Sequence, residues 1–128
     1  MINFCIGCAQ FGMNYGVTNK LGKVDELEVK NIIKFAIENN INFFDTSQAY
    51  GNSEEIIGKF IWNFKDAKII NKLKPEKKRS FTEKDIEHWE SNFRKSLRNL
   101  NKDKLDSFLI HDPNDLKKKG YEILEYWL

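Results

Sequence analysis

Short apolar segments alternate with longer amphipathic segments along the chain, and this alternation limits the possible folds more than any other feature of the sequence. Four segments are short and largely apolar, which is typical of strands buried on both faces. Each is followed by a segment whose apolar residues recur at a spacing of three or four, which is typical of helices. The expected strands are residues 2–7, 41–45, 68–73 and 105–110.

Helix-start signals follow the first two expected strands. Asp25, with Glu28 three residues later, has the pattern of a capping box in front of an apolar helical stripe. Ser53 is expected to cap a second helix, because its hydroxyl can accept a hydrogen bond from a free backbone N–H. Glu54 and Glu55 would then lie in the first turn, where the helix dipole favours negative charge.

The same signals predict two further helices. Thr82 and Asp85 form a variant capping box, with aspartate in place of the usual glutamate. We expect the row of Trp89 and Phe93 behind it to pack into the core. Residues 116–128 also have helical spacing and are expected to form the last helix.

The resulting order, βαβαβαβα, predicts a parallel α/β sheet with right-handed crossovers. Two architectures are compatible with it. The chain is either half of a (β/α)8 TIM barrel, with four βα units, or a small doubly wound sheet whose own helices cover both faces. A length of 128 residues, without a linker-like segment, indicates one unit spanning residues 1–128.

Composition and charge exclude several classes of protein. The 21 basic and 19 acidic residues nearly cancel, so the net charge of +2 predicts neither nucleic-acid nor membrane-surface binding. No apolar run approaches the roughly 18 residues of a membrane helix, and the N-terminus lacks a secretory pattern. We therefore expect a cytoplasmic protein. Cys5 and Cys8 form a C-x-x-C, but they would point to opposite faces of a strand, so we expect no metal or redox site.

Polar side chains stand where three successive expected strands end. Asp45 ends the second strand, Lys72 lies near the end of the third, and His111 follows the fourth, with Tyr50 in the loop after Asp45. Function gathers at this end of parallel strands, so the four side chains should converge. An ammonium beside a phenol makes its proton easier to give, a carboxylate holds the ammonium, and an imidazole can orient a carbonyl oxygen. Such a set can protonate a carbonyl oxygen while hydride reaches the carbon.

A resemblance to a known family rests on Lys72 and on four short segments. The segments are GCAQFG at residues 7–12, FFDT at 43–46, YGNSE at 50–54 and LIHDP at 109–113. With these residues in these places, the sequence resembles the aldo-keto reductases, which are NADP-dependent (β/α)8-barrel oxidoreductases.

The resemblance implies a role for each residue of the set. Tyr50 would be the general acid that protonates an aldehyde, ketone or sugar carbonyl, and Lys72 would assist it. Asp45 would hold Lys72 and touch the ribose next to the nicotinamide, while His111 would orient the substrate carbonyl.

The resemblance also implies where NADPH would bind. The turn at Gly7 and Cys8 would lie near the cofactor together with Asp45. The family often has threonine at the position of Cys8, so one cofactor hydrogen bond would be missing here.

Length sets a further expectation, because a full barrel takes about 250 residues. By the resemblance, the later strands hold most of the cofactor. We therefore expect a form truncated in or after the fourth helix, which binds NADPH weakly or not at all. Alternatively, two copies self-associate, or a second polypeptide supplies the missing barrel half. A different class of function, a non-catalytic half-barrel association module or pseudoenzyme, also remains open.

Overall fold

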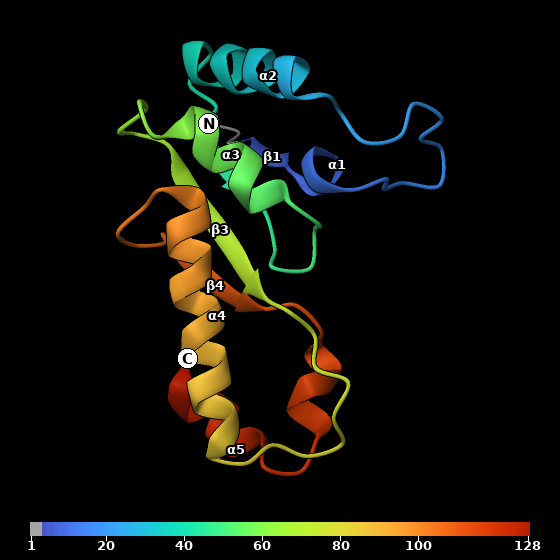
Figure 1. The fold of residues 1–128 in the computed structure, drawn as a ribbon, viewed down its shortest axis with the longest axis vertical. Helices are drawn as coiled ribbons and strands as arrows, with labels where there is room; N and C mark the ends of the chain where they lie inside the picture. Colours follow the sequence, from blue (N-terminus) through green and yellow to red (C-terminus); the bar gives the residue numbers. More distant parts are fainter. Residues whose placement is uncertain (1–3) are drawn as a thin grey trace.

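The computed structural model describes residues 4–128, which form one four-stranded parallel sheet with helices packed against it (Figure 1). The strands pair in the order in which they occur in the chain, β1-β2-β3-β4. Gly7 is paired with Asp45, and Lys72 with Leu109. The strands are β1 (Cys5–Gly7), β2 (Phe43–Asp45), β3 (Lys68–Leu73) and β4 (Ser107–Ile110).

Three strands are shorter than predicted. β2 and β4 each begin two residues later, because strand pairing starts only where a neighbouring strand lies alongside. For the first strand, residues 2 and 3 of the predicted range lie outside the described residues. The helices that connect and follow the strands are α1 (Ala9–Gly12), α2 (Glu26–Glu38), α3 (Ser53–Ile61), α4 (Lys84–Leu100), the 3-10 helix η1 (Pro113–Lys117) and α5 (Tyr121–Trp127).

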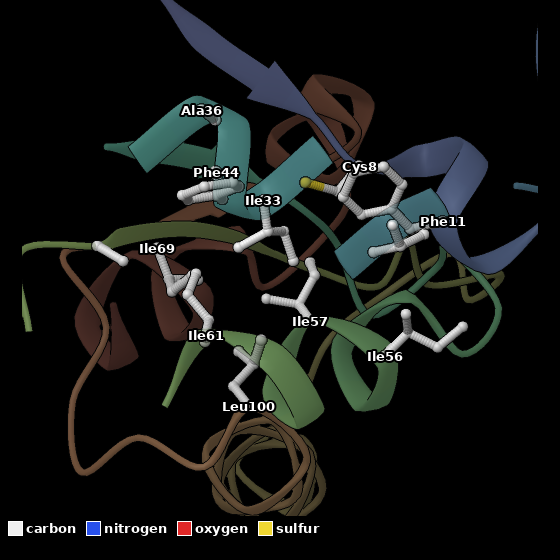
Figure 2. Close-up of a cluster of buried hydrophobic side chains, with 12 residues drawn as sticks. Cys8, Phe11, Ile33, Ala36, Phe44, Ile56, Ile57, Ile61, Ile69 and Leu100 are labelled. Carbon is white, nitrogen blue, oxygen red and sulfur yellow. The ribbon is translucent and has the colours of Figure 1, made fainter. Parts of the chain in front are cut away.

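The main core lies between one face of the sheet and the helices α2 and α3 (Figure 2). Phe44 and Ile69 point from adjacent strands into this core and are fully buried. A second cluster joins Leu73 of β3 and Leu124 of α5 to Trp89 of α4, as predicted for Trp89. The main cluster is made of Cys8, Phe11, Val29, Ile33, Ala36, Phe44, Ile56, Ile57, Ile61, Ala67, Ile69 and Leu100.

The other face of the sheet bears the alternate residues of each strand, because successive side chains point to opposite sides. Within residues 4–128 no helix packs on this face: Cys5 is exposed and Leu109 is 45% exposed. The doubly wound alternative is therefore wrong. Such a sheet reverses its strand order at a switch point and carries helices on both faces, whereas this order runs without reversal. We call this side of the sheet the inner face.

Helix caps agree with the sequence at α2 and differ at α3. The Asp25 carboxylate accepts a hydrogen bond from the backbone N–H of Glu28 at 2.9 Å, as predicted. At α3 the prediction for Ser53 was wrong, because Asn52 occupies the N-cap position, without a capping bond from its side chain, and Ser53 is already helical. The Ser53 hydroxyl instead donates to the Cys8 carbonyl oxygen at 2.8 Å, which ties the start of α3 to the end of β1.

The C-terminal segment is two helices rather than the single helix predicted for residues 116–128. η1 begins at Pro113, where the Asp112 carboxylate accepts from the backbone N–H of Asn114. Gly120 then interrupts the helical path with a φ of +75°, and a Cβ there would lie 2.3 Å from the carbonyl oxygen of Phe81. α5 starts only beyond this close backbone contact. Within residues 4–128, no helix has the length and apolar character needed to cross a membrane.

Candidate active site

The structure brings the four predicted side chains together at one rim of the sheet. Asp45 is the last residue of β2, Lys72 lies one residue before the end of β3, and His111 directly follows β4. Tyr50 lies in the loop between β2 and α3, above the same rim. Sequential pairing of parallel strands produces this convergence, because it aligns their carboxyl ends.

Lys72 is the centre of the arrangement. Its ammonium forms an ion pair with the Asp45 carboxylate, and it also donates to the backbone carbonyl oxygen of Thr46 at 3.0 Å. The Lys72 side chain is 15% exposed and that of Asp45 is 35% exposed. The pair is thus partly screened from water, and two acceptors hold the ammonium in one place.

The Tyr50 ring lies close to both the ammonium and the imidazole. The Lys72 nitrogen is 5.4 Å from the centroid of the Tyr50 ring, within cation–π range. The His111 ring meets the Tyr50 ring edge to face, with centroids 5.4 Å apart and planes at 88°. Among residues 4–128 the phenol oxygen has no hydrogen-bond partner. The expected neighbours are present, although Lys72 makes no hydrogen bond with the Tyr50 hydroxyl.

Two glycines allow the Tyr50 loop to lie against the end of α1. A Cβ at Gly12 would be 1.8 Å from the Tyr50 carbonyl oxygen. Gly51 has a φ of +57°, and a Cβ there would be 2.2 Å from the Gly12 carbonyl oxygen. Backbone therefore packs directly on backbone here. This contact fixes the loop that carries the phenol.

Sequence reasoning missed Ser47, which contacts His111. Its hydroxyl oxygen is 2.8 Å from His111 Nδ1 and also accepts from the backbone N–H of Ala49 at 3.0 Å. Burial lowers the pKa of His111, and the nearby Lys72 ammonium lowers it further. The neighbouring Asp45 carboxylate opposes this shift only in part. The imidazole is therefore neutral at neutral pH.

Tyr15 is a second side chain near the site that the sequence did not single out. It lies in the loop after α1, and its ring centroid is 6.3 Å from that of Tyr50. Its backbone carbonyl accepts from the Asn19 amide at 3.0 Å and from the Gln10 amide at 2.9 Å. The one feature of the sequence that could have pointed to Tyr15 is the Gly- and Asn-rich composition of its loop, since such residues favour folded turns.

The three residues predicted at the cofactor lie in different environments. Gly7 is exposed on the inner face beside Asp45, and a Cβ there would meet nothing within 4 Å. The Cys8 side chain is fully buried in the main core, and burial raises its pKa well above the usual value. Only its backbone reaches the rim, where the Cys8 N–H donates to the Asp45 carbonyl oxygen at 2.8 Å.

No group of three or more His, Cys, Asp or Glu side chains within residues 4–128 is placed to hold a metal ion. The chemistry that the rim itself offers is that of one ammonium, one carboxylate, one phenol and one neutral imidazole. Such groups can hold and protonate an oxygen atom.

Two solved structures from Pseudomonas aeruginosa, both provisionally assigned as aldo-keto reductases, resemble this chain. One matches with a TM-score of 0.72 and 25% sequence identity, over 94% of this chain and 49% of its own. The other matches with a TM-score of 0.70 and 24% identity, over 94% of this chain and 47% of its own. The chain thus spans about half the length of these proteins, and its fold is that of half a (β/α)8 barrel.

The sequence comparison agrees with the structural one. The model of the aldo/keto reductase family matches residues 3–127, which is nearly the whole chain. The chain belongs to the aldo/keto reductase family.

Proposed function

We propose that this chain carries the proton-donating part of an NADP-dependent oxidoreductase site, which reduces an aldehyde, ketone or sugar carbonyl by hydride transfer. Tyr50 is the general acid in this proposal. The observation that carries it is the position of the Tyr50 ring, with the Lys72 ammonium 5.4 Å from its centroid and the His111 ring edge-on at 5.4 Å. Family membership supports the reaction class.

Lys72 assists the proton transfer through its charge. When Tyr50 gives its proton to the carbonyl oxygen, negative charge develops on the phenol oxygen. A fixed ammonium nearby stabilises that charge, more so because the Lys72 side chain is only 15% exposed to solvent. Asp45 and the Thr46 carbonyl oxygen keep the ammonium in place, so it needs little rearrangement during the reaction.

His111 orients the substrate. Its Nδ1 is engaged by Ser47, which leaves Nε2 to face an incoming oxygen. Because the lowered pKa keeps the ring neutral, it serves as a hydrogen-bond donor and leaves protonation to Tyr50. The edge-to-face contact of the two rings supports a carbonyl oxygen that accepts from both Tyr50 and His111.

The rim also fits the nicotinamide end of the cofactor. Gly7 leaves open space next to Asp45, where a planar ring and its ribose would lie. The partly exposed Asp45 carboxylate can accept a hydrogen bond from a ribose hydroxyl. When bound, reduced nicotinamide supplies the hydride. Cys8 contributes its backbone alone, since its thiol is buried.

The experiment is NADPH oxidation by the full chain with a panel of small aldehydes, ketones and sugars. Tyr50→Phe keeps the ring and removes the proton, so we expect turnover to fall by about 100-fold or more. Tyr126→Phe is the matched control, because Tyr126 is 88% exposed on α5. Equal rates for the two variants would contradict the role of Tyr50. A folded chain without any turnover would contradict catalysis by this chain.

A second candidate function, association through the inner face, is favoured by the exposure of that face. Leu109 at 45% exposure and Cys5 lie on it without a covering helix in the described part of the chain. Apolar surface of this kind is often an interaction site. Light scattering tests this candidate: a discrete dimer supports it, and a stable monomer opposes it.

A further inference from the structure

Ser47 places a buried hydroxyl against the imidazole of the site. Its Oγ lies 2.8 Å from His111 Nδ1, although the two residues are far apart in the sequence. Ser47 is 1% exposed, so water cannot compete for this bond. Ser47 follows β2 and His111 follows β4, so the bond crosses the rim above β3.

The hydrogen bonds around Ser47 determine which group donates. The Ala49 backbone N–H already donates to Ser47 Oγ at 3.0 Å. The hydroxyl has one hydrogen of its own, and within residues 4–128 the one acceptor in reach of Oγ is His111 Nδ1. If Nδ1–H were the donor instead, the Ser47 hydrogen would be buried without an acceptor, which is unfavourable. The hydroxyl therefore donates to Nδ1.

We propose that Ser47 is a positioning residue, which holds the neutral imidazole of His111 in the tautomer that carries its hydrogen on Nε2. A neutral imidazole has one N–H, so a ring that accepts at Nδ1 must be protonated at Nε2. Among the described residues Nε2 has no hydrogen-bond partner, so its N–H is available to a carbonyl oxygen beside Tyr50. This inference deepens the proposed function and rests on it for its catalytic meaning.

The charges around the ring support a neutral imidazole. Burial lowers the pKa of His111, and the Lys72 ammonium acts in the same direction. The carboxylates of Asp45 and Asp112 oppose the shift without reversing it. The tautomer is therefore the relevant variable at neutral pH. Without Ser47, some rings would present the Nε2 lone pair to the carbonyl oxygen, which repels it.

The test is nitrogen NMR of the imidazole in the full chain labelled with ¹⁵N. The sequence has two histidines, so a His88→Gln background leaves a single ring to observe. At a pH where the ring is neutral, we expect Nδ1 to have the shift of an unprotonated nitrogen and Nε2 that of a protonated one. In Ser47→Ala the share of the Nδ1–H form should rise by about tenfold, the effect of one lost hydrogen bond.

Ser47→Thr provides the rescue, because it keeps the hydroxyl, and its spectrum should match that of the parent. A parent ring protonated at Nδ1, or a Ser47→Ala ring with an unchanged tautomer ratio, would overturn the inference. If Ser47→Ala does not fold, the spectrum of the parent decides the inference: a ring protonated at Nε2 supports it, and a ring protonated at Nδ1 overturns it.

The NMR result and the activity assay fail separately. The NMR measurement needs neither NADPH nor turnover, so a ring with Nε2–H in an inactive chain contradicts the proposed function and leaves the tautomer assignment standing. An active chain with Nδ1–H contradicts the role of Ser47 and donation by His111 Nε2, and leaves Tyr50 as the general acid. We also expect kcat/KM to fall in Ser47→Ala, chiefly through kcat, and to recover in Ser47→Thr.

Discussion

Replacement of Glu54 by alanine distinguishes two explanations for an acidic residue at the start of a helix. The sequence suggests that Glu54 and Glu55 both act on the dipole of α3, which is worth about 0.3–1 kcal/mol for each residue. The structure shows a different role for Glu54, which is only 8% exposed. Its carboxylate accepts from the Asn71 amide of β3 at 2.8 Å and from the Asn99 amide of α4 at 3.0 Å.

The size of the expected loss of stability in Glu54→Ala follows from these two hydrogen bonds. A hydrogen bond to a charged group contributes about 1.5–3 kcal/mol, and an orphaned buried donor costs about 1–3 kcal/mol. Asn71 is fully buried, so Glu54→Ala would leave its amide without an acceptor. Relief of the buried carboxylate's own desolvation offsets part of the loss. We expect the free energy of unfolding to fall by about 2–4 kcal/mol.

Urea unfolding, followed by circular dichroism at neutral pH, measures this change. Glu55→Ala is the matched control, because Glu55 is exposed on the same first turn. It should lose less than about 1 kcal/mol. Glu54→Gln should lie between the two, since one amide oxygen can still accept. Equal small losses for Glu54→Ala and Glu55→Ala would refute the bridging role and restore the dipole explanation.

Three other predictions concern the loop of the site, the cofactor and pH. Gly12→Ala should lower the free energy of unfolding, measured by urea titration, by about 1–3 kcal/mol, because its Cβ would lie 1.8 Å from the Tyr50 carbonyl oxygen. Gly7→Ala is the control, because a Cβ there meets nothing within 4 Å. Titration of the full chain with NADPH, followed by nucleotide fluorescence, should show weak binding, because the described rim fits one end of the cofactor. Tight binding would contradict this. Burial raises the pKa of Asp85, but hydrogen bonds from Lys78 and the Thr82 backbone outweigh this and lower it. The ionised Asp85 carboxylate therefore stabilises the fold above its unfolded pKa of about 3.9, and this contribution is lost as the pH falls through the lower pKa of the folded state. The urea midpoints of wild type and Asp85→Asn should therefore converge as the pH falls below about 4.

Local patterns were sufficient to predict the four strands and the helices α2, α3 and α4 between them, but not the short α1 or the division of the last helix into η1 and α5. Asp25 caps α2 because a capping bond spans three residues and depends on little else. The strand segments were found from their apolar character, but their first residues were not. The first residue of a strand depends on where the backbone of the neighbouring strand can pair with it, and that neighbour lies one βα unit away in the chain.

Predictions that require long-range contacts succeeded only where topology supplied them. Asp45, Lys72 and His111 were placed together correctly because the ends of parallel strands must align. Ser47 was missed, since nothing in its local sequence indicates a partner beyond β3. Ser53 was assigned as a cap for the same reason, because its bond to the Cys8 carbonyl oxygen exists only after β1 and α3 have met.

Every strand of the sheet pairs with the strand that immediately precedes or follows it in the chain. A nascent polypeptide that emerges from the ribosome from its N-terminus can therefore add each strand to an edge that already exists. Within residues 4–128 no strand of the sheet has to wait for the partner it pairs with in the order β1-β2-β3-β4, because that partner is one βα unit away and each loop to be closed is short. The topology thus suits growth of the sheet by successive addition during synthesis.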